Sequence, residues 1–150
     1  MKKIYITPKK LANLQMSLLK QIRNSGRKFT SVVGIANGGL HISKPLAMLL
    51  HLPHYSVEIS YYDGTKRRKK PVIKTDIKEI HNALIVDDLI DSGGTFETFK
   101  NLFELEDNAI AVLFWHKSAS IKPDFYAKIK PEAWLVFYWE KEYWNRENEN

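Results

Sequence analysis

The sequence predicts an α/β fold in which helices flank a mainly parallel, twisted sheet. Two short runs, SVVGIA (Ser31–Ala36) and ALIVD (Ala83–Asp87), are nearly continuous in apolar residues, as strands buried on both faces are. Each run is followed by a glycine-bearing turn and then by a segment with apolar residues at helical spacing. Strand, turn and helix repeated in this order favour parallel strands joined by right-handed crossovers.

The first expected element is a helix that begins after Thr7. Thr7 is a suitable N-cap, Pro8 suits the first helical position, and Gly26 can end the helix. The apolar residues between these signals fall on one face, at Leu11, Leu14, Leu18, Leu19 and Ile22. We therefore expect this helix to pack against the sheet.

The remaining elements are predicted from the same two periodicities. Further strands are expected at Tyr55–Ser60, Pro71–Thr75 and Ala109–Trp115, helices at about Ile42–Leu50 and Thr95–Leu105, and extended structure in Asp124–Ile129 and Ala133–Trp139. No repeat or linker divides the chain. Residues 1–150 are therefore expected to form a single domain, with a polar tail from about residue 143.

The composition is that of a globular protein. Hydrophobic residues make up 44% and charged residues 27% of the 150 residues, which excludes a disordered chain. The chain has no cysteine, so it has neither disulfides nor a thiolate metal site, in keeping with a reducing compartment. No apolar run approaches the roughly 20 residues that a membrane span requires. We expect a cytoplasmic protein without a membrane partner.

The formal net charge is +6, and much of the excess lies in KRRKK (Lys66–Lys70). A basic excess suits nucleic acid, a membrane surface or an anionic small substrate. The run lies between turn signals, so it is either a solvated loop or a loop that binds an anion.

The stretch ALIVDDLIDSGGTF carries the chemistry. Its acids, Asp87, Asp88 and Asp91, follow a buried strand, at the edge of a parallel sheet where ligands bind. Two glycines allow consecutive backbone amides to point inward, two hydroxyls add donors, and a helix N-terminus follows. These residues, Ser92, Gly93, Gly94 and Thr95, are predicted to form a phosphate cradle.

Carboxylates repel phosphate, so the three acids must serve other tasks. They can bind vicinal hydroxyls, hold Mg²⁺ or move a proton. Taken one at a time, each is better explained as a helix cap or a turn residue, and only the ordered set favours function. The chain lacks both G-x-x-x-x-G-K-[ST] and G-x-G-x-x-G, which argues against an ordinary NTPase and a dinucleotide dehydrogenase.

This stretch resembles the phosphoribosyl-pyrophosphate (PRPP) signature of type I phosphoribosyltransferases. VVGIANGGLHISKPLAMLLHLPHYSVEISYYD is similar to the region of bacterial xanthine-guanine phosphoribosyltransferases that carries the pyrophosphate loop. AVLFWHKS and PEAWLVFYWE resemble that family's purine-binding strand and C-terminal hood. The resemblance covers about residues 4–142 and implies the type I fold with a small C-terminal hood.

For PRPP, the resemblance assigns a role to each acid. Asp87 and Asp88 would bind the ribose hydroxyls and help hold Mg²⁺, and Asp91 would face purine N7 and handle its proton as the catalytic residue. The 5′-phosphate would be wrapped by Ser92, Gly93, Gly94 and Thr95.

For pyrophosphate, the resemblance implies a loop of Asn37, Gly38 and Gly39. Close relatives have Arg-Gly-Gly here, so Asn37 removes a cation near the leaving group. Arg68, or its neighbour Arg67, would close over pyrophosphate from a mobile basic loop.

For the purine, the resemblance implies three contacts. Lys117 would donate to O6 and so select 6-oxopurines, Trp134 would stack on the base, and the backbone at Leu135 would read its edge. Without the resemblance, Lys117 would be a solvated strand end and Trp134 a core residue.

The implied activity is a Mg²⁺-dependent purine phosphoribosyltransferase of purine salvage. It would transfer the 5-phosphoribosyl group from PRPP to guanine, xanthine or hypoxanthine, giving the nucleoside monophosphate and pyrophosphate, in an expected homo-oligomer without nucleic acid. The alternative is a non-catalytic PRPP sensor that binds nucleic acid, which the basic surface and Asn37 favour. Asp91, Lys117 and Trp134 favour the enzyme, because a sensor needs no purine pocket. A salvage enzyme for another base is a third possibility.

Overall fold

The computed structural model describes residues 1–63 and 66–146, with the side chains of 62–63 and 67–69 also left undescribed. Its strands are β1 (Lys3–Ile6), β2 (Ser31–Ala36), β3 (His54–Asp63), β4 (Lys66–Lys74), β5 (Ala83–Ile90), β6 (Ala109–Trp115), β7 (Phe125–Ile129) and β8 (Trp134–Phe137). Its helices are α1 (Pro8–Asn24), α2 (Leu40–Leu50), α3 (Gly94–Leu102) and α4 (Lys141–Asn145). None of the described helices is long and apolar enough to cross a membrane.

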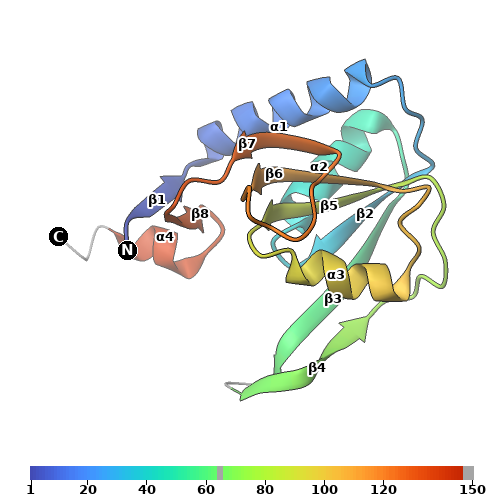
Figure 1. Cartoon of the computed structure of the whole chain (residues 1–150). Helices are drawn as coiled ribbons and strands as arrows, with labels where there is room; N and C mark the ends of the chain where they lie inside the picture. Colours follow the sequence, from blue (N-terminus) through green and yellow to red (C-terminus); the bar gives the residue numbers. More distant parts are fainter. Residues whose placement is uncertain (64–65, 147–150) are drawn as a thin grey trace.

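Six strands form the main sheet in the order β4-β3-β2-β5-β6-β7. Every neighbouring pair is parallel except β3 and β4. Figure 1 shows the sheet with helices on both of its faces. The predicted α/β fold with a mainly parallel sheet is therefore confirmed.

The strands bury alternate residues against different helices. Val32 and Leu84 belong to a core cluster that includes Leu18 of α1, whereas Val33 and Ile85 belong to a second cluster on the side of α3. Successive side chains of a strand point to opposite faces, so a strand covered on both faces must be apolar throughout. This is the reason that β2 and β6 read as continuous apolar runs.

Helix α1 begins as its sequence signals predict. The Thr7 hydroxyl accepts a hydrogen bond from the Lys10 amide at 3.1 Å, and Pro8 is the first helical residue. The helix ends just before Gly26, which adopts a φ of 70°. Four apolar residues of the predicted face are buried, namely Leu11, Leu18, Leu19 and Ile22.

The basic run forms a strand, where the sequence led us to expect a loop. β4 begins at Lys66 and not at Pro71, and it pairs antiparallel with β3. The strand is held by backbone hydrogen bonds to β3, and solvent-facing side chains on an edge strand can be basic. A basic run therefore does not reveal such a strand from the sequence. The side chains of Arg67 and Arg68 lie outside the described residues.

The hood joins the two ends of the described chain. β1 pairs in parallel with β8 in a separate two-stranded sheet, and α4 follows (Figure 1). β1 was not predicted, because four residues before a helix show no periodicity of their own. The tail was predicted to begin too early, since Tyr143 is buried in α4 and packs edge-on against Tyr5. Residues 147–150 of that tail lie outside the described residues.

Candidate active site

The site lies where β2 and β5, neighbours in the sheet, reach their carboxyl ends. The Asn37–Gly38–Gly39 loop leaves β2 after a cis peptide bond between Ala36 and Asn37. A Cβ atom at Gly39 would lie 2.9 Å from the Val86 carbonyl oxygen and 3.0 Å from Asp87 Oδ1, and one at Gly38 would collide with the Asp88 carboxylate. Only glycine therefore lets this loop lie against the two acids.

Asp87 and Asp88 lie within the last residues of β5, which extends to Ile90 and so runs past the predicted strand end. Asp87 Oδ1 accepts from the Asp88 amide and Asp88 Oδ1 from the Leu89 amide, each at 2.8 Å. Burial raises the pKa of the Asp87 carboxyl well above its usual value, and the neighbouring Asp88 charge raises this pKa further. Burial also raises the pKa of Asp88. A cation or hydroxyl donors placed beside these two carboxyl groups would stabilise their charged form.

The two carboxylates suit Mg²⁺ that arrives with a substrate. Within the described residues there is no group of three or more acidic, histidine or cysteine side chains that could hold a metal ion by itself. Mg²⁺ is usually bound by one or two carboxylates together with substrate phosphates and water. Asp87 and Asp88 fit that pattern.

The Ser92–Thr95 segment forms the turn that the sequence predicted. Gly93 adopts a φ of 96°, and α3 begins at Gly94. The Ser92 carbonyl accepts from the Ser120 amide at 2.9 Å, and a side chain at Gly93 would collide with Ser120. The first amides of α3 lack helical partners and carry the positive end of the helix dipole, so the turn can hold a phosphate.

Tyr61 holds this turn from the side, and the sequence did not identify it. Its hydroxyl donates to the Gly94 carbonyl at 3.2 Å and lies 2.6 Å from Thr98 Oγ1. Tyr61 shares a strand face with Val57 and Ile59, which both contact the cluster around α3. The alternation of β3 could therefore have indicated a residue directed at α3.

A cavity of about 370 Å³ adjoins the acids on the side of the hood. It is lined by Gly38, Asp88, Leu89, Asp91, Lys130, Ala133, Trp134, Leu135, Phe137, Trp139 and Glu140. Trp134 is 55% exposed, which suits a stacking surface better than a core residue. The cavity thus brings predicted residues of three segments together: the Gly38 loop, Asp88 and Asp91, and Trp134 with Leu135.

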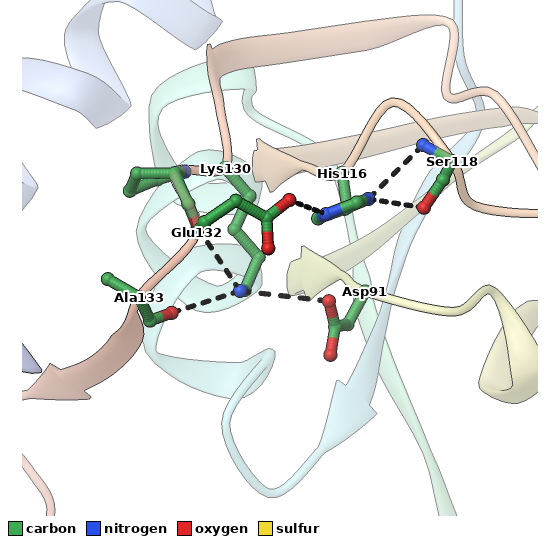
Figure 2. Close-up of polar contacts among 7 residues, drawn as sticks. Asp91, His116, Ser118, Lys130, Glu132 and Ala133 are labelled. Carbon is green, nitrogen blue, oxygen red and sulfur yellow. Dashed lines mark hydrogen bonds and ion pairs between the residues drawn. The ribbon is translucent and has the colours of Figure 1, made fainter. Parts of the chain in front are cut away.

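Lys117, the predicted purine contact, does not line this cavity. β6 ends at Trp115 and the chain turns at once, which leaves Lys117 exposed in the turn. The cavity instead contains Lys130, whose side chain is 12% exposed and whose Nζ lies 3.7 Å from Asp91 Oδ1 (Figure 2). The sequence reasoning missed Lys130, since a lysine before a proline reads as a solvated loop residue.

A second contact connects the turn after β6 to the segment that carries Lys130. His116 Nε2 lies 2.6 Å from Glu132 Oε1, and the Ser118 amide donates to His116 Nδ1 at 3.1 Å. Because Nδ1 accepts, the neutral ring carries its proton on Nε2 and donates it to Glu132. Figure 2 shows these residues beside Lys130 and Asp91.

A larger hollow, of about 540 Å³, lies at the opposite edge of the sheet. Its lining includes Ser31, at the start of β2, and Ile80 and His81, just before β5. Ligands of parallel sheets bind at the carboxyl ends of the strands, so the smaller cavity is the candidate site.

Known proteins are similar to this chain in sequence and in fold. The model of the phosphoribosyl transferase domain family matches residues 2–143. The chain is 28% identical over 116 residues to the xanthine-guanine phosphoribosyltransferase of Cereibacter sphaeroides, covering 73% of this chain and 68% of that protein.

Two solved structures are similar over nearly their whole length. The purine phosphoribosyltransferase from Pyrococcus horikoshii superposes with a TM-score of 0.78 at 30% identity, covering 94% of this chain and 95% of that one. The Helicobacter pylori xanthine-guanine-hypoxanthine phosphoribosyltransferase has the same fold, with a TM-score of 0.76, 23% identity and coverage of 97% and 99%. The chain therefore belongs to the type I phosphoribosyltransferase family, among its purine phosphoribosyltransferases.

Proposed function

We propose that the chain transfers the 5-phosphoribosyl group from PRPP to N9 of guanine, xanthine or hypoxanthine, in a Mg²⁺-dependent reaction of purine salvage. One observation carries this proposal. A single cavity places Asp88 of the β5 acid pair, Gly38 of the loop after β2 and the exposed Trp134 of the hood beside Asp91. PRPP needs the first two features, and a planar base needs the third.

The substrate would bind in three parts. The 5′-phosphate lies in the turn from Ser92 to Thr95, the ribose hydroxyls on Asp87 and Asp88, and pyrophosphate on the amides of Gly38 and Gly39. Mg²⁺ bound with PRPP would neutralise charge on the leaving pyrophosphate. Because Asn37 supplies no cation there, the two glycine amides and the arginines of β4 are the protein groups proposed to bind it.

The bond changes occur at C1′ of the ribose. N9 forms a bond to C1′ while the bond from C1′ to pyrophosphate breaks, and its electron pair leaves on pyrophosphate. The base loses one proton as N9 attacks, and Asp91 accepts that proton from N7. Positive charge develops on the ribose in the transition state, and the carboxylates of β5 stabilise it.

Release of pyrophosphate tests this function. Purified protein is mixed with PRPP, Mg²⁺ and guanine, xanthine, hypoxanthine or adenine in separate reactions. Pyrophosphate is expected with 6-oxopurines and not with adenine, and chelation of Mg²⁺ should abolish it. A protein that turns over none of the four bases would contradict the proposal.

The alternative is a PRPP sensor that binds nucleic acid, which Asn37 and the net charge of +6 favour. The base cavity argues against it. A sensor would bind a specific nucleic acid in a strongly salt-dependent manner and release no pyrophosphate. Titration of labelled DNA and RNA at two salt concentrations separates the two functions.

A further inference from the structure

Three aromatic rings form a stack at the wall of the base cavity. Trp139 lines the cavity, and its ring centroid lies 4.6 Å from that of Phe137 at an interplanar angle of 8°. The ring of His41, in α2, lies 4.1 Å from the Trp139 ring at an angle of 2°. Phe137 is buried and His41 is exposed, so the stack runs from the core to the surface. His41 thus adds to the hood a ring from a different part of the fold.

Trp139 belongs to the short turn that follows β8. The Glu140 amide donates to the Phe137 carbonyl at 3.0 Å, and the Glu140 carboxylate accepts from the Phe137 amide at 2.6 Å. These bonds fix the backbone of the turn, but they do not fix the rotation of the indole about its side-chain bonds. Stacked aromatic pairs are stabilising beyond the area that they bury. The contacts with Phe137 and His41 therefore hold the plane of the indole.

His41 is also connected to the glycine loop on the other side of the site. It is the second residue of α2, and its amide donates to the Gly38 carbonyl at 3.3 Å. Gly38 lies so close to Asp88 that an added Cβ would collide with the Asp88 carboxylate. One residue thus joins the loop proposed to bind pyrophosphate to the wall proposed to bind the base.

We propose that His41 is a positioning residue that holds the Trp139 ring in the wall of the base cavity by stacking on it. This proposal rests on the proposed function, because it concerns the base site. His41 is not among the residues that line the base cavity, so it acts through Trp139. A planar base would then meet an indole that is already held in place, and less side-chain freedom is lost when the base binds.

Stacking must be separated from a role of His41 as a cation. Burial lowers the pKa of the His41 ring most, the Asp88 charge partly opposes this, and Lys44 lowers the pKa further. The ring is therefore mainly neutral at pH 7. A phenyl ring at position 41 can stack in the same way but cannot carry a charge. His41→Phe is thus the substitution that tells stacking from charge.

The test compares His41→Ala and His41→Phe with His81→Ala, which changes an exposed histidine at the opposite edge of the sheet. KM and kcat are measured with hypoxanthine and PRPP, and IMP binding is measured by calorimetry without PRPP. We expect His41→Ala to raise KM for hypoxanthine and Kd for IMP about 5-fold, while kcat and KM for PRPP stay within about 2-fold. His41→Phe should keep the wild-type values, as should His81→Ala.

A second measurement follows Trp139 without any ligand. Quenching of tryptophan fluorescence by acrylamide is compared between each protein and the same protein carrying Trp139→Leu, which isolates the signal of this ring. His41→Ala should make Trp139 more accessible to the quencher, and His41→Phe should not. In the Trp139→Leu background, His41→Ala should have no further effect on IMP binding, because the two residues act as one unit.

Three results would overturn the proposal: equal losses in His41→Ala and His41→Phe, a larger rise in KM for PRPP than for hypoxanthine, or unchanged quenching of Trp139 in His41→Ala. If the wild type turns over no base, the proposed function fails. The quenching of Trp139 still decides in that case whether His41 holds the ring.

Discussion

The Tyr61 hydroxyl lies 2.6 Å from Thr98 Oγ1, which joins the end of β3 to the first turns of α3. The same hydroxyl donates to the Gly94 carbonyl in the phosphate turn. The hairpin that bears the basic run is thereby connected to the part of the site that would bind the 5′-phosphate. The two regions proposed to bind the ends of PRPP are therefore joined by the hydrogen bonds of one side chain.

Tyr61→Phe should therefore weaken PRPP binding without altering base selection. Removal of the hydroxyl loses two hydrogen bonds at a cost of about 1–2 kcal/mol. We expect KM for PRPP to rise several-fold while the ratio of activities with hypoxanthine and adenine is unchanged. Tyr55→Phe is the control, because Tyr55 is on the same strand but exposed at the other edge of the sheet. Equal effects of both variants would contradict this coupling.

Gly39→Ala should abolish PRPP binding. The added methyl would collide with the Ile35 carbonyl oxygen and lie 2.9 Å from the Val86 carbonyl oxygen and 3.0 Å from Asp87 Oδ1, so the loop must shift from its place against β2 and the acids. Gly26→Ala is the matched control, because Gly26 has a φ of 70° with nothing within 4 Å of an added Cβ. Both variants should lose about 1 kcal/mol or more of unfolding free energy, and only Gly39→Ala should lose PRPP binding by calorimetry.

Asp91→Asn should lower turnover strongly while PRPP binding persists. The amide keeps the shape of the side chain but cannot accept the proton from N7 at an anionic oxygen. We expect a fall in kcat of about 100-fold or more, measured by pyrophosphate release, with an unchanged dissociation constant for PRPP. Unchanged turnover would refute the proton role of Asp91.

Asp88→Asn should stabilise the ligand-free protein while removing its function. Burial raises the pKa of Asp87 and the Asp88 charge adds to it, so the folded protein holds protons that the unfolded chain has released. The unfolding free energy therefore falls as the pH rises above about 4, the usual carboxyl range, until Asp87 and Asp88 ionise in the folded state.

Asp88→Asn removes one of the two buried carboxyl groups and should raise the unfolding free energy at pH 7 by about 1 kcal/mol. Urea unfolding at pH 5 and pH 7 measures both the gain in unfolding free energy and the smaller fall of that free energy between the two pH values. Asp76→Asn, at an exposed aspartate, is the control and should leave the slope unchanged. A wild-type protein more stable at pH 7 than at pH 5 would contradict the raised pKa values.

Local patterns in the sequence predicted the helices that bury one apolar face and the strands that are apolar throughout. β2 and β6 have the predicted bounds, and α1 begins and ends at its capping residues. The acids at the end of β5 and the glycines after β2 also lie together, because adjacent parallel strands end at the same edge of the sheet. In these cases the information lies within a few residues of the element.

Residues brought in by long-range folding could not be predicted in the same way. Lys130 enters the cavity because the segment after β7 returns to β5, and its partner Asp91 is far away in the sequence. Lys117, to which the resemblance assigns a purine contact, lies exposed in the turn after β6 and outside the cavity lining, so that role stays a prediction. Similarly, β1 is a strand because of β8, not because of its own four residues.

The pairing of β1 with β8 has a consequence for the order in which the protein is assembled. The Trp134 amide donates to the Lys2 carbonyl at 2.8 Å, so the wall of the base cavity rests on the segment that leads into β1. During synthesis, β2, β5 and α3 emerge before β8, and the phosphate turn can form on them. The proposed purine side of the site forms only when β8 pairs with β1, so a nascent chain would acquire its two proposed binding surfaces one after the other.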